Sequence, residues 1–379
     1  MRSLDIPLTG RASSPGQRRG LLARLHIDGP LLLGLFVLGG LGLAVLYSAG
    51  GGHTELVVRQ LVRIGLALTV MMVLAQIPPR RLYQWSPWLF IAGTGLLVAV
   101  LAFGDIGKGA QRWLDLGFVR FQPSEAMKLA VPMMLARHLA QKPLPPSFWR
   151  LLGGLLLMVA PVLLIAKQPD LGTSLLIASS GFFVLFLGGL SWRLLGGATV
   201  LAVPGAWILW EYGMKDYQRQ RVLTFLNPQE DPLGSGYHII QSTIAIGSGG
   251  TYGKGWLNGT QSHLDFLPER STDFIFAVFG EEFGLIGALI LLLIYVLIVG
   301  RGLYISAVAQ DSFSRLLAGS ISLTFLVYLL VNTGMVSGLL PVVGVPLPLV
   351  SYGGTSLVTL MAGFGILMAI HTHRRLLPT

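Results

Sequence analysis

The chain has 379 residues, of which 53% are hydrophobic and only 12% are charged, and its formal net charge is +10. A mean hydropathy of +0.69 excludes an ordinary water-soluble domain and predicts a membrane protein. Cysteine is absent, which excludes disulfide bonds, thiolate metal sites and cysteine nucleophiles.

The first 29 residues are polar and rich in Pro, Gly, Ser and Arg. This composition predicts a disordered basic tail. The apolar run that follows is too long for a cleavable signal peptide, and no small-residue cleavage site accompanies it. We therefore expect a cytoplasmic tail over 1–29 and a single transmembrane domain over 30–375.

Ten apolar runs follow the tail, each close to the roughly 20 residues that a helix needs to cross a bilayer core about 30 Å thick. They lie at 30–49, 56–76, 83–103, 123–140, 151–167, 171–189, 192–212, 273–299, 316–338 and 350–371. The run at 123–140 is the weakest, because it holds Glu125, Lys128, Arg137 and His138. A spanning backbone must satisfy its own hydrogen bonds, so we predict an all-α, polytopic integral membrane protein with about ten transmembrane helices.

Orientation follows from the basic residues. With an even number of spans both termini share one side, and that side receives more than half of the Lys and Arg residues but only Asp5, Asp28 and Asp311 of the acids. Such an excess of basic residues marks cytoplasmic loops. Attraction to anionic membrane lipids accounts for the remaining positive charge, and no basic stretch is interleaved with aromatic residues, so we expect no nucleic-acid partner.

Two longer connections fall on the outer side, at 104–122 and 213–272. Long loops in compact proteins are usually functional. The amphipathic stretches 217–228 and 237–250 are either short helices at the membrane surface or parts of a solvated loop with a few buried anchors. The sequence GSGGTYGKG at 247–255 lacks the spacing of a phosphate-binding loop, so we predict a flexible turn there.

Arg59 and Arg63 lie four residues apart on the second predicted span. Long basic side chains near a helix end commonly extend toward lipid headgroups. The functional alternative is contact with a lipid phosphate.

A first polar cluster combines Arg112 and Gln122 with Glu125 and Lys128. Pro123 suits the first turn of a helix, and Glu125 then complements the helix dipole. Lys128 lies about one turn deeper, where an ion pair with Glu125 is structurally plausible. Binding of a substrate is the alternative for these residues.

A second cluster, Lys167, Gln168 and Asp170, lies between the fifth and sixth spans. Pro169 breaks the helix and Asp170 is suited to cap the next one. A tight hairpin explains this cluster as well as a binding site does.

The segment 256–287 is the densest concentration of charge in the apolar part of the chain. It contains His263, Asp265, Glu269, Arg270, Asp273, Glu281 and Glu282. Thr272 or Asp273 is suited to cap the long apolar helix that follows. Glu281 and Glu282 fall two turns into that helix, where a carboxylate is costly without a partner.

The proline-rich stretch 341–356 predicts an extended or re-entrant segment, followed by a helix start of small residues. Close packing through Gly353 and Gly354 is the simpler explanation. Irregular backbone at membrane depth is tolerated where it is buried in protein or lines a polar cavity. Together the clusters indicate an outer cavity with acids and bases, which fits either an enzyme acting on a lipid phosphate or a transporter.

Four long motifs carry a resemblance to a known family. They are QRWLDLGFVRFQPSEAMKLA at 111–130, KQPDLGTSLL at 167–176, GTQSHLDFLPERSTDFIFAVFGEEFGLIG at 259–287 and LPVVGVPLPLVSYGGTS at 340–356. The chain resembles the SEDS family of peptidoglycan polymerases, and its LPER and GTQSHLDF sequences favour the RodA branch over the division branch FtsW. Ser271 departs from the family, in which His commonly precedes TDF.

The resemblance implies polymerisation of lipid II into β-1,4 glycan strands at the outer face of the bacterial cytoplasmic (inner) membrane, for cell elongation and rod shape. It also implies partnership with a class B penicillin-binding protein and other elongation proteins. The family's essential carboxylate falls on Asp273. Its other functional positions fall on Arg112, Glu125, Lys128, Gln168 and Asp170.

In the reaction that the resemblance implies, Asp273 is the candidate base, and Arg112, Lys128 and Arg270 are candidates to bind the pyrophosphate leaving group. No cofactor is assigned; His263, Asp265 and Asp273 are the candidate ligands of a divalent cation such as Mg or Mn. A lipid II flippase and a non-catalytic scaffold of the elongation machinery are the alternatives. Polar residues at the outer face favour an enzyme, because transporters usually hold their substrates near the midplane.

Overall fold

The computed structural model describes residues 25–107, 110–115, 120–214, 216–230, 235–263 and 269–373, so the predicted tail lies almost wholly outside the described residues. The α-helices are α2 (Gly29–Ala49), α3 (Thr54–Ala75), α4 (Pro79–Phe103), α5 (Pro123–Ala140), α6 (Phe148–Lys167), α7 (Leu171–Leu187), α8 (Trp192–Ile208), α9 (Asp216–Leu226), α10 (Ser235–Gly249), α11 (Thr260–His263), α12 (Ile275–Ala307), α13 (Ser312–Val336) and α14 (Thr355–Thr372). A π-helix (Leu209–Gly213, η1) continues α8, and a 3-10 helix (Pro228–Glu230, η2) follows α9.

Seven of the described helices are long and apolar enough to cross a membrane, namely α2, α3, α4, α6, α12, α13 and α14. The other three predicted spans coincide with α5, α7 and α8, which have 18, 17 and 17 residues. The prediction of a polytopic, largely helical membrane protein is therefore confirmed. The number of ten spans stays a prediction.

The connection at 104–122, which the sequence predicts on the outer side, contains a small sheet. Its strands are β1 (Asp105–Gly107), β2 (Ala110–Asp115) and β3 (Arg120–Phe121), which pair antiparallel in the order β1-β2-β3. Leu114 of β2 pairs with Phe121 of β3, which leads directly into α5. These short strands lie in a connection between helices, where a hairpin satisfies the backbone hydrogen bonds of an irregular segment, and the predicted all-α fold class is confirmed.

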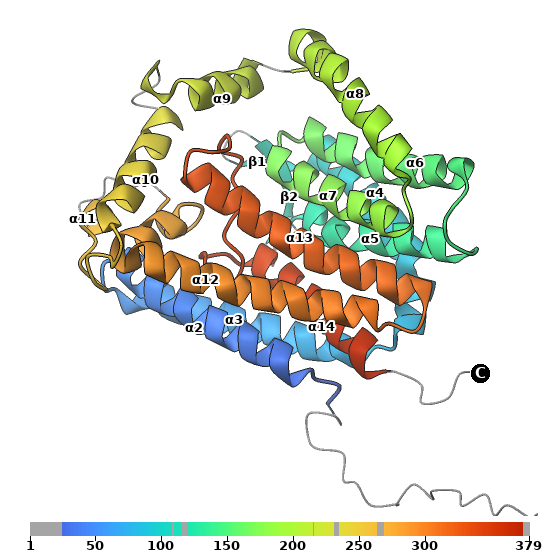
Figure 1. Cartoon of the computed structure of the whole chain (residues 1–379), viewed down its shortest axis with the longest axis horizontal. Helices are drawn as coiled ribbons and strands as arrows, with labels where there is room; N and C mark the ends of the chain where they lie inside the picture. The colour runs from blue at the N-terminus through green and yellow to red at the C-terminus, as the bar shows by residue number, and fades with distance from the viewer. Residues whose placement is uncertain are drawn as a thin grey trace, which may run out of the picture.

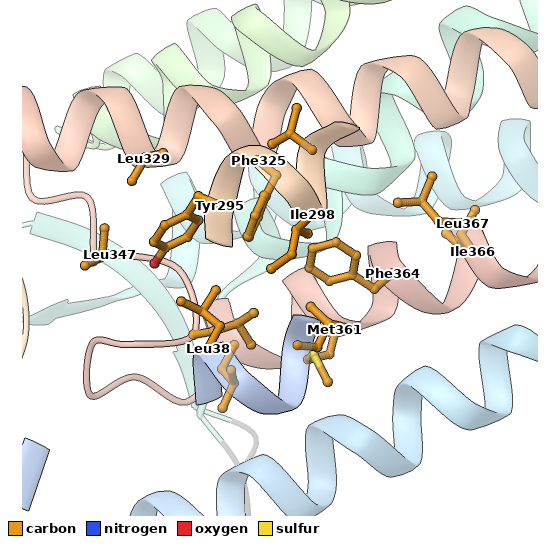
Figure 2. Packing of buried hydrophobic residues seen from close by; sticks show 14 of the residues in the cluster. Leu38, Tyr295, Ile298, Phe325, Leu329, Leu347, Met361, Phe364, Ile366 and Leu367 are labelled. Atoms are coloured by element: carbon orange, nitrogen blue, oxygen red, sulfur yellow. The ribbon is translucent and has the colours of Figure 1, made fainter. Parts of the chain in front are cut away.

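The core lies where α12, α13 and α14 pack together and against the helices around them. α12 packs on α13 and α2, α14 on α3, and α13 on α7 and α5 (Figure 1). Figure 2 shows the rings of Tyr295, Phe325 and Phe364 in this core, with ring centroids 5.5 Å apart for Tyr295 and Phe325 and 5.0 Å apart for Phe325 and Phe364. The Tyr295 hydroxyl donates to the Pro348 carbonyl at 2.6 Å, which ties the core to the segment that precedes α14.

The outer faces of the helices are apolar, as the membrane prediction requires. Large side chains such as Val62, Ile91 and Leu297 are exposed in the isolated chain. α8, α9 and α10 follow one another along the edge of the bundle (Figure 1), and Val203 and Trp207 of α8 are also exposed. Because lipid tails are as apolar as these side chains, a bilayer accommodates such faces without cost.

The amphipathic stretches of the long connection before α12 are helical. They form α9 and α10, so the helical alternative is confirmed over a plain solvated loop. Whether these helices contact the membrane surface stays a prediction.

The long helix α12 is interrupted at Gly284, where φ is 63° and ψ is −162°. Residues with a Cβ rarely adopt this conformation. Four backbone hydrogen bonds join the two sides of the break to the turn at 250–255: Lys254 N to Glu281 O (3.0 Å), Gly255 N to Glu282 O (3.0 Å), Leu285 N to Gly250 O (3.0 Å) and Ile286 N to Thr251 O (3.1 Å). The predicted turn is present only over 250–255, because residues 247–249 end α10. It is packed tightly, since a Cβ at Gly253 would lie 2.1 Å from Glu282 O.

Candidate functional site

Asp170 joins three segments at the start of α7. It is the N-cap of this helix, and its Oδ1 accepts a hydrogen bond from Thr173 N at 3.2 Å. Its Oδ2 accepts from Gln122 Nε2 at 3.1 Å and lies 3.9 Å from Arg112 Nε. Arg112 also donates to the Pro169 carbonyl. The predicted cap is therefore confirmed, and the same carboxylate gathers an amide and a guanidinium around it.

Glu125 and Lys128 form the ion pair that their spacing on α5 predicts. Lys128 Nζ lies 2.8 Å from Glu125 Oε1, and their side chains are 7% and 9% exposed. The ammonium also lies 5.3 Å from the ring centre of Tyr328 on α13. Glu125 Oε2 has no hydrogen-bond partner among the described residues, which leaves one acceptor of this buried pair available.

Gln168 is buried and makes a contact that holds the fold. Its Nε2 donates to the Leu97 carbonyl at 3.0 Å, which fixes the α6–α7 connection to the C-terminal part of α4. The side chain thus has a structural use, and its predicted role in substrate binding stays a prediction.

Asp273 lies in a turn that precedes α12. Thr272 N and Phe274 N donate to the Glu269 carbonyl at 3.0 and 3.3 Å, which closes the turn. The helix begins at Ile275 with Phe274 as its N-cap and without a side-chain cap, so the expectation that Thr272 or Asp273 caps it was wrong. The Asp273 carboxylate is therefore not consumed by capping.

The segment 341–354 between α13 and α14 is non-helical, as its prolines predict: residues 341–347 have no regular secondary structure and 348–350 form a turn. Ser351 Oγ donates to the Thr272 carbonyl at 2.6 Å, and Tyr352 N donates to the Ser271 carbonyl at 2.8 Å. These two bonds fix residues 341–354, which we call the outer loop, against the turn that carries Asp273. α14 begins only at Thr355, later than the sequence predicts.

The outer loop brings the two acidic sites together. A Cβ at Gly172, two residues beyond Asp170, would lie 2.6 Å from Val343 O. A Cβ at Gly344 would lie 3.5 Å from Asp273 Oδ2. Adjacent residues of one loop therefore contact the start of α7 and the Asp273 carboxylate, and we take this junction as the candidate active site.

His238 of α10 flanks the turn. Its ring stacks on Phe274 with centroids 5.5 Å apart. Burial lowers the pKa of His238 below its ordinary value, and the nearby Glu269 carboxylate partly opposes this effect. Arg270, a predicted pyrophosphate ligand, lies half-buried in the same turn as Asp273.

The conceivable cation site is only partly described, because Asp265 lies outside the described residues. Within the described ranges, no group of three or more His, Asp or Glu residues is arranged to hold a metal ion. A cation requirement stays untested.

Glu281 and Glu282 have structural partners that the sequence does not reveal. Glu281 is fully buried; its carboxylate pairs with Lys254 Nζ at 2.7 Å and accepts from Thr260 N at 2.9 Å and Gln261 N at 3.1 Å. Glu282 accepts a hydrogen bond from Ser48 Oγ of α2. Glu281 thus attaches the segment 254–261 to α12, and Glu282 attaches α2 to it.

Asn332 is a site residue that sequence reasoning missed. It is fully buried in α13, and its Nδ2 donates to the carbonyls of Asp273 and Val345, each at 2.8 Å. The available signal was a carboxamide in the middle of an apolar span, which is rare without a partner.

Comparison with known proteins decides the family. The family model FTSW_RODA_SPOVE, described as "Cell cycle protein", matches residues 25–376. The chain belongs to the SEDS family. This SEDS protein is 59% identical over 354 residues to "Peptidoglycan glycosyltransferase MrdB" of Escherichia coli (strain K12), and the match covers 93% of this chain and 96% of the relative. It is 31% identical over 420 residues to "Peptidoglycan glycosyltransferase RodA" of Treponema pallidum (strain Nichols), with 91% and 97% covered.

Solved structures share the fold of this SEDS protein. A chain of a peptidoglycan synthase complex, described for its coordination of polymerization and crosslinking, matches with a TM-score of 0.80 and 35% identity over 92% of this chain and 99% of that chain. The crystal structure of Thermus thermophilus RodA matches with a TM-score of 0.69 and 31% identity over 91% of this chain and 96% of that chain.

Proposed function

We propose that this SEDS protein is a peptidoglycan glycosyltransferase of the RodA type, which polymerises lipid II into β-1,4 glycan strands for cell elongation and rod shape. One observation carries the chemistry. The Asp273 carboxylate caps no helix and lies beside Gly344, and the preceding residue, Val343, contacts the start of α7 at Gly172. The outer loop therefore links the Asp273 carboxylate to the start of α7, where the guanidinium of Arg112 lies beside Asp170. The 59% identity to MrdB over most of both chains supports the same activity.

The basic residues orient the site. Lys and Arg residues are in excess on the side of the membrane that holds both termini, which supports a protein of the cytoplasmic (inner) membrane with both termini in the cytoplasm. The turn with Asp273 and the outer loop then lie at the outer face, where a lipid-linked disaccharide is available for polymerisation.

The reaction is a single inverting displacement. The 4-hydroxyl of one lipid-linked disaccharide attacks the anomeric carbon of another chain, and the bond from that carbon to the pyrophosphate oxygen breaks. The α-linked donor becomes a β-1,4 bond, undecaprenyl pyrophosphate leaves, and Asp273 takes the proton of the attacking hydroxyl.

The cations have different parts in this reaction. The side chain of Arg112 is 32% exposed and is available to the leaving pyrophosphate, whereas Lys128 is enclosed with Glu125. Lys128 therefore acts through the electrostatic potential of its charge and by positioning Glu125. Asp170 holds Arg112 in place, and Gln168 holds the α6–α7 connection. Arg270 is a further candidate for the pyrophosphate, because it lies in the Asp273 turn.

The partner is a class B penicillin-binding protein, which crosslinks the new strands, together with other elongation proteins. The structural match to a chain of a peptidoglycan synthase complex supports this assignment. Coupling polymerisation to crosslinking requires both proteins at the same outer face.

The test uses purified protein in liposomes, with its penicillin-binding partner and lipid II. Asp273→Asn and Asp273→Ala should lower polymer formation by about 10²–10⁴-fold, the usual effect of losing a well-placed base. Glu55→Gln is the control, because Glu55 is an exposed acid of the outer part of α3. Polymer at the wild-type rate from Asp273→Asn would remove the base assignment. Movement of labelled lipid II across the liposome without any polymer would instead assign a flippase.

A further inference from the structure

An apolar cavity of about 340 Å³ lies between α2, α3 and the start of α14. Its lining residues are all apolar and include Phe36 of α2, Leu61 of α3 and Leu349 of the outer loop. The volume falls within the range of about 300–1,000 Å³ that ligand pockets occupy, and an apolar cavity of this kind excludes water and accepts hydrocarbon. Phe36 and Leu61 are 52% and 48% exposed, so the cavity opens sideways toward the bilayer.

Glycines create the space. Gly39 and Gly40 of α2 and Gly65 of α3 line the cavity, and a Cβ at any of them would meet no atom within 4 Å. Glycine inside a helix is less favourable than alanine, and at these three positions no close backbone contact requires it. The cavity therefore exists because both helices carry glycine, which has no side chain, at the positions that face it.

A cation lies beside the cavity. On α3, Arg63 lies between Leu61 and Ile64, and both of these residues line the cavity. Its guanidinium lies 4.2 Å from the ring centre of Tyr352 at the end of the outer loop, and no described carboxylate pairs with it. Arg59, one turn further out, is paired with Glu55. A basic group above an apolar cavity is complementary to a lipid, whose phosphate is anionic and whose chain is apolar.

The position of the cavity along the outer loop identifies the lipid. Val343 and Gly344 contact the candidate active site, whereas Leu349 lines the cavity and its carbonyl oxygen would lie 2.6 Å from a Cβ at Gly42. Beyond Leu349, Ser351 and Tyr352 bond to the carbonyls of Thr272 and Ser271, so this end of the loop supports the turn that carries Asp273. The cavity lining itself holds no charged or polar side chain, so a lipid chain inside it meets no acid–base group, which fits a resident bilayer lipid better than a reacting one.

We propose that this cavity holds one acyl chain of an anionic phospholipid, that Arg63 binds the lipid's phosphate, and that the bound lipid supports residues 349–352 of the outer loop. The lipid completes the packing beneath Leu349 and fixes the Arg63–Tyr352 contact above it. Loss of the lipid leaves the loop without support on this side and lowers the stability of the protein.

Thermal unfolding of delipidated protein in detergent tests the headgroup. Phosphatidylglycerol at about 100-fold above its Kd should raise Tm by roughly 3 °C, more than phosphatidylcholine at the same concentration. Arg63→Gln should abolish the difference between the two lipids. Arg80→Gln, which removes an exposed charge at the start of α4, should keep it. Equal responses to both lipids in the wild type, or an unchanged difference in Arg63→Gln, would refute the role of Arg63.

Gly65→Leu tests the cavity, since the leucine side chain enters open space and replaces the acyl chain. This variant should unfold at a higher temperature than the wild type without lipid, and phosphatidylglycerol should shift its Tm little. Gly300→Leu is the matched control, because Gly300 is an exposed glycine of α12 whose Cβ would also meet no atom within 4 Å. A full lipid response in Gly65→Leu, or a wild-type protein that responds to polyprenyl phosphate but not to phosphatidylglycerol, would overturn the proposal. Neither readout depends on glycosyltransferase activity.

Discussion

Asn332 holds Asp273 in place through the backbone. The same side-chain nitrogen of Asn332 donates to Asp273 O and to Val345 O, each at 2.8 Å, so one carboxamide of α13 fixes the turn before α12 and the outer loop together. The neighbouring Gly344 approaches the Asp273 carboxylate from the loop side. The position of this carboxylate therefore depends on α13 as well as on its own turn.

Replacing Asn332 should disturb the site more than the fold. Asn332→Ala leaves two carbonyls without their donor, which should lower the free energy of unfolding by about 1–3 kcal/mol and reduce polymerisation more than the stability loss explains. Thermal unfolding and lipid II polymerisation measure the two effects. Thr333→Ala, which removes only a hydroxyl bonded within α13, is the control and should keep both near the wild-type values. Normal polymerisation by a folded Asn332→Ala would show that the Asn332 hydrogen bonds to Asp273 and Val345 are not required for activity.

Asp170 has a structural and a functional contact that substitutions can separate. Asp170→Asn keeps an oxygen for Thr173 N but loses the charge beside Arg112. It should retain most of the stability and lose polymerisation, whereas Asp170→Ala should also lose about 0.5–2 kcal/mol as a missing cap. Asp311 makes an equivalent cap with Ser314 N at 2.9 Å on α13, so Asp311→Asn should leave polymerisation intact. Full activity in Asp170→Asn would limit Asp170 to capping.

The break in α12 should tolerate no side chain. At Gly284→Ala the new Cβ would lie 2.3 Å from Gly253 N, in a backbone conformation that costs about 1–3 kcal/mol for non-glycine residues. Thermal unfolding should show a marked loss of stability. Gly300→Ala, in the regular part of the same helix, should be neutral or stabilising by up to about 1 kcal/mol. Equal stabilities of the two variants would mean that the break is not required.

His238 should make stability depend on pH. Because burial lowers its pKa below the ordinary 6.5, the unfolded chain takes up the proton first as the pH falls. The contribution of neutral His238 is therefore complete above pH 6.5 and is lost progressively below it. Tm measured between pH 8 and pH 5 should fall less steeply in His238→Gln than in the wild type. Parallel curves for the two proteins would contradict the burial effect.

Sequence reasoning succeeded where the cause is local. Pro123 and the apolar run behind it predict α5 over the same residues that the structure has, 123–140, although this run contains Glu125, Lys128 and Arg137. The spacing of Glu125 and Lys128 predicts their ion pair, and the prolines after 341 predict that the outer loop is not helical.

Other features depend on distant partners, which local patterns do not specify. The hydropathy of α12 is continuous across Gly284, and the break becomes favourable only because the turn at 250–255 supplies hydrogen bonds to both sides. Likewise Glu281 is a costly buried acid in sequence, and its partner Lys254 precedes it by 27 residues. Asn332 could be recognised as unusual, but its two acceptors follow from the tertiary arrangement alone.

The interrupted helix also sets a boundary for engineering. The turn at 250–255 supplies donors to one side of the break and acceptors to the other, and the Glu281 carboxylate reaches Lys254, Thr260 and Gln261. A chimera that exchanges the outer segment with a relative, and joins it at the start of α12, would separate these partners. A chimera should therefore exchange at least residues 249–286, so that the turn at 250–255 and the first part of α12 come from the same protein.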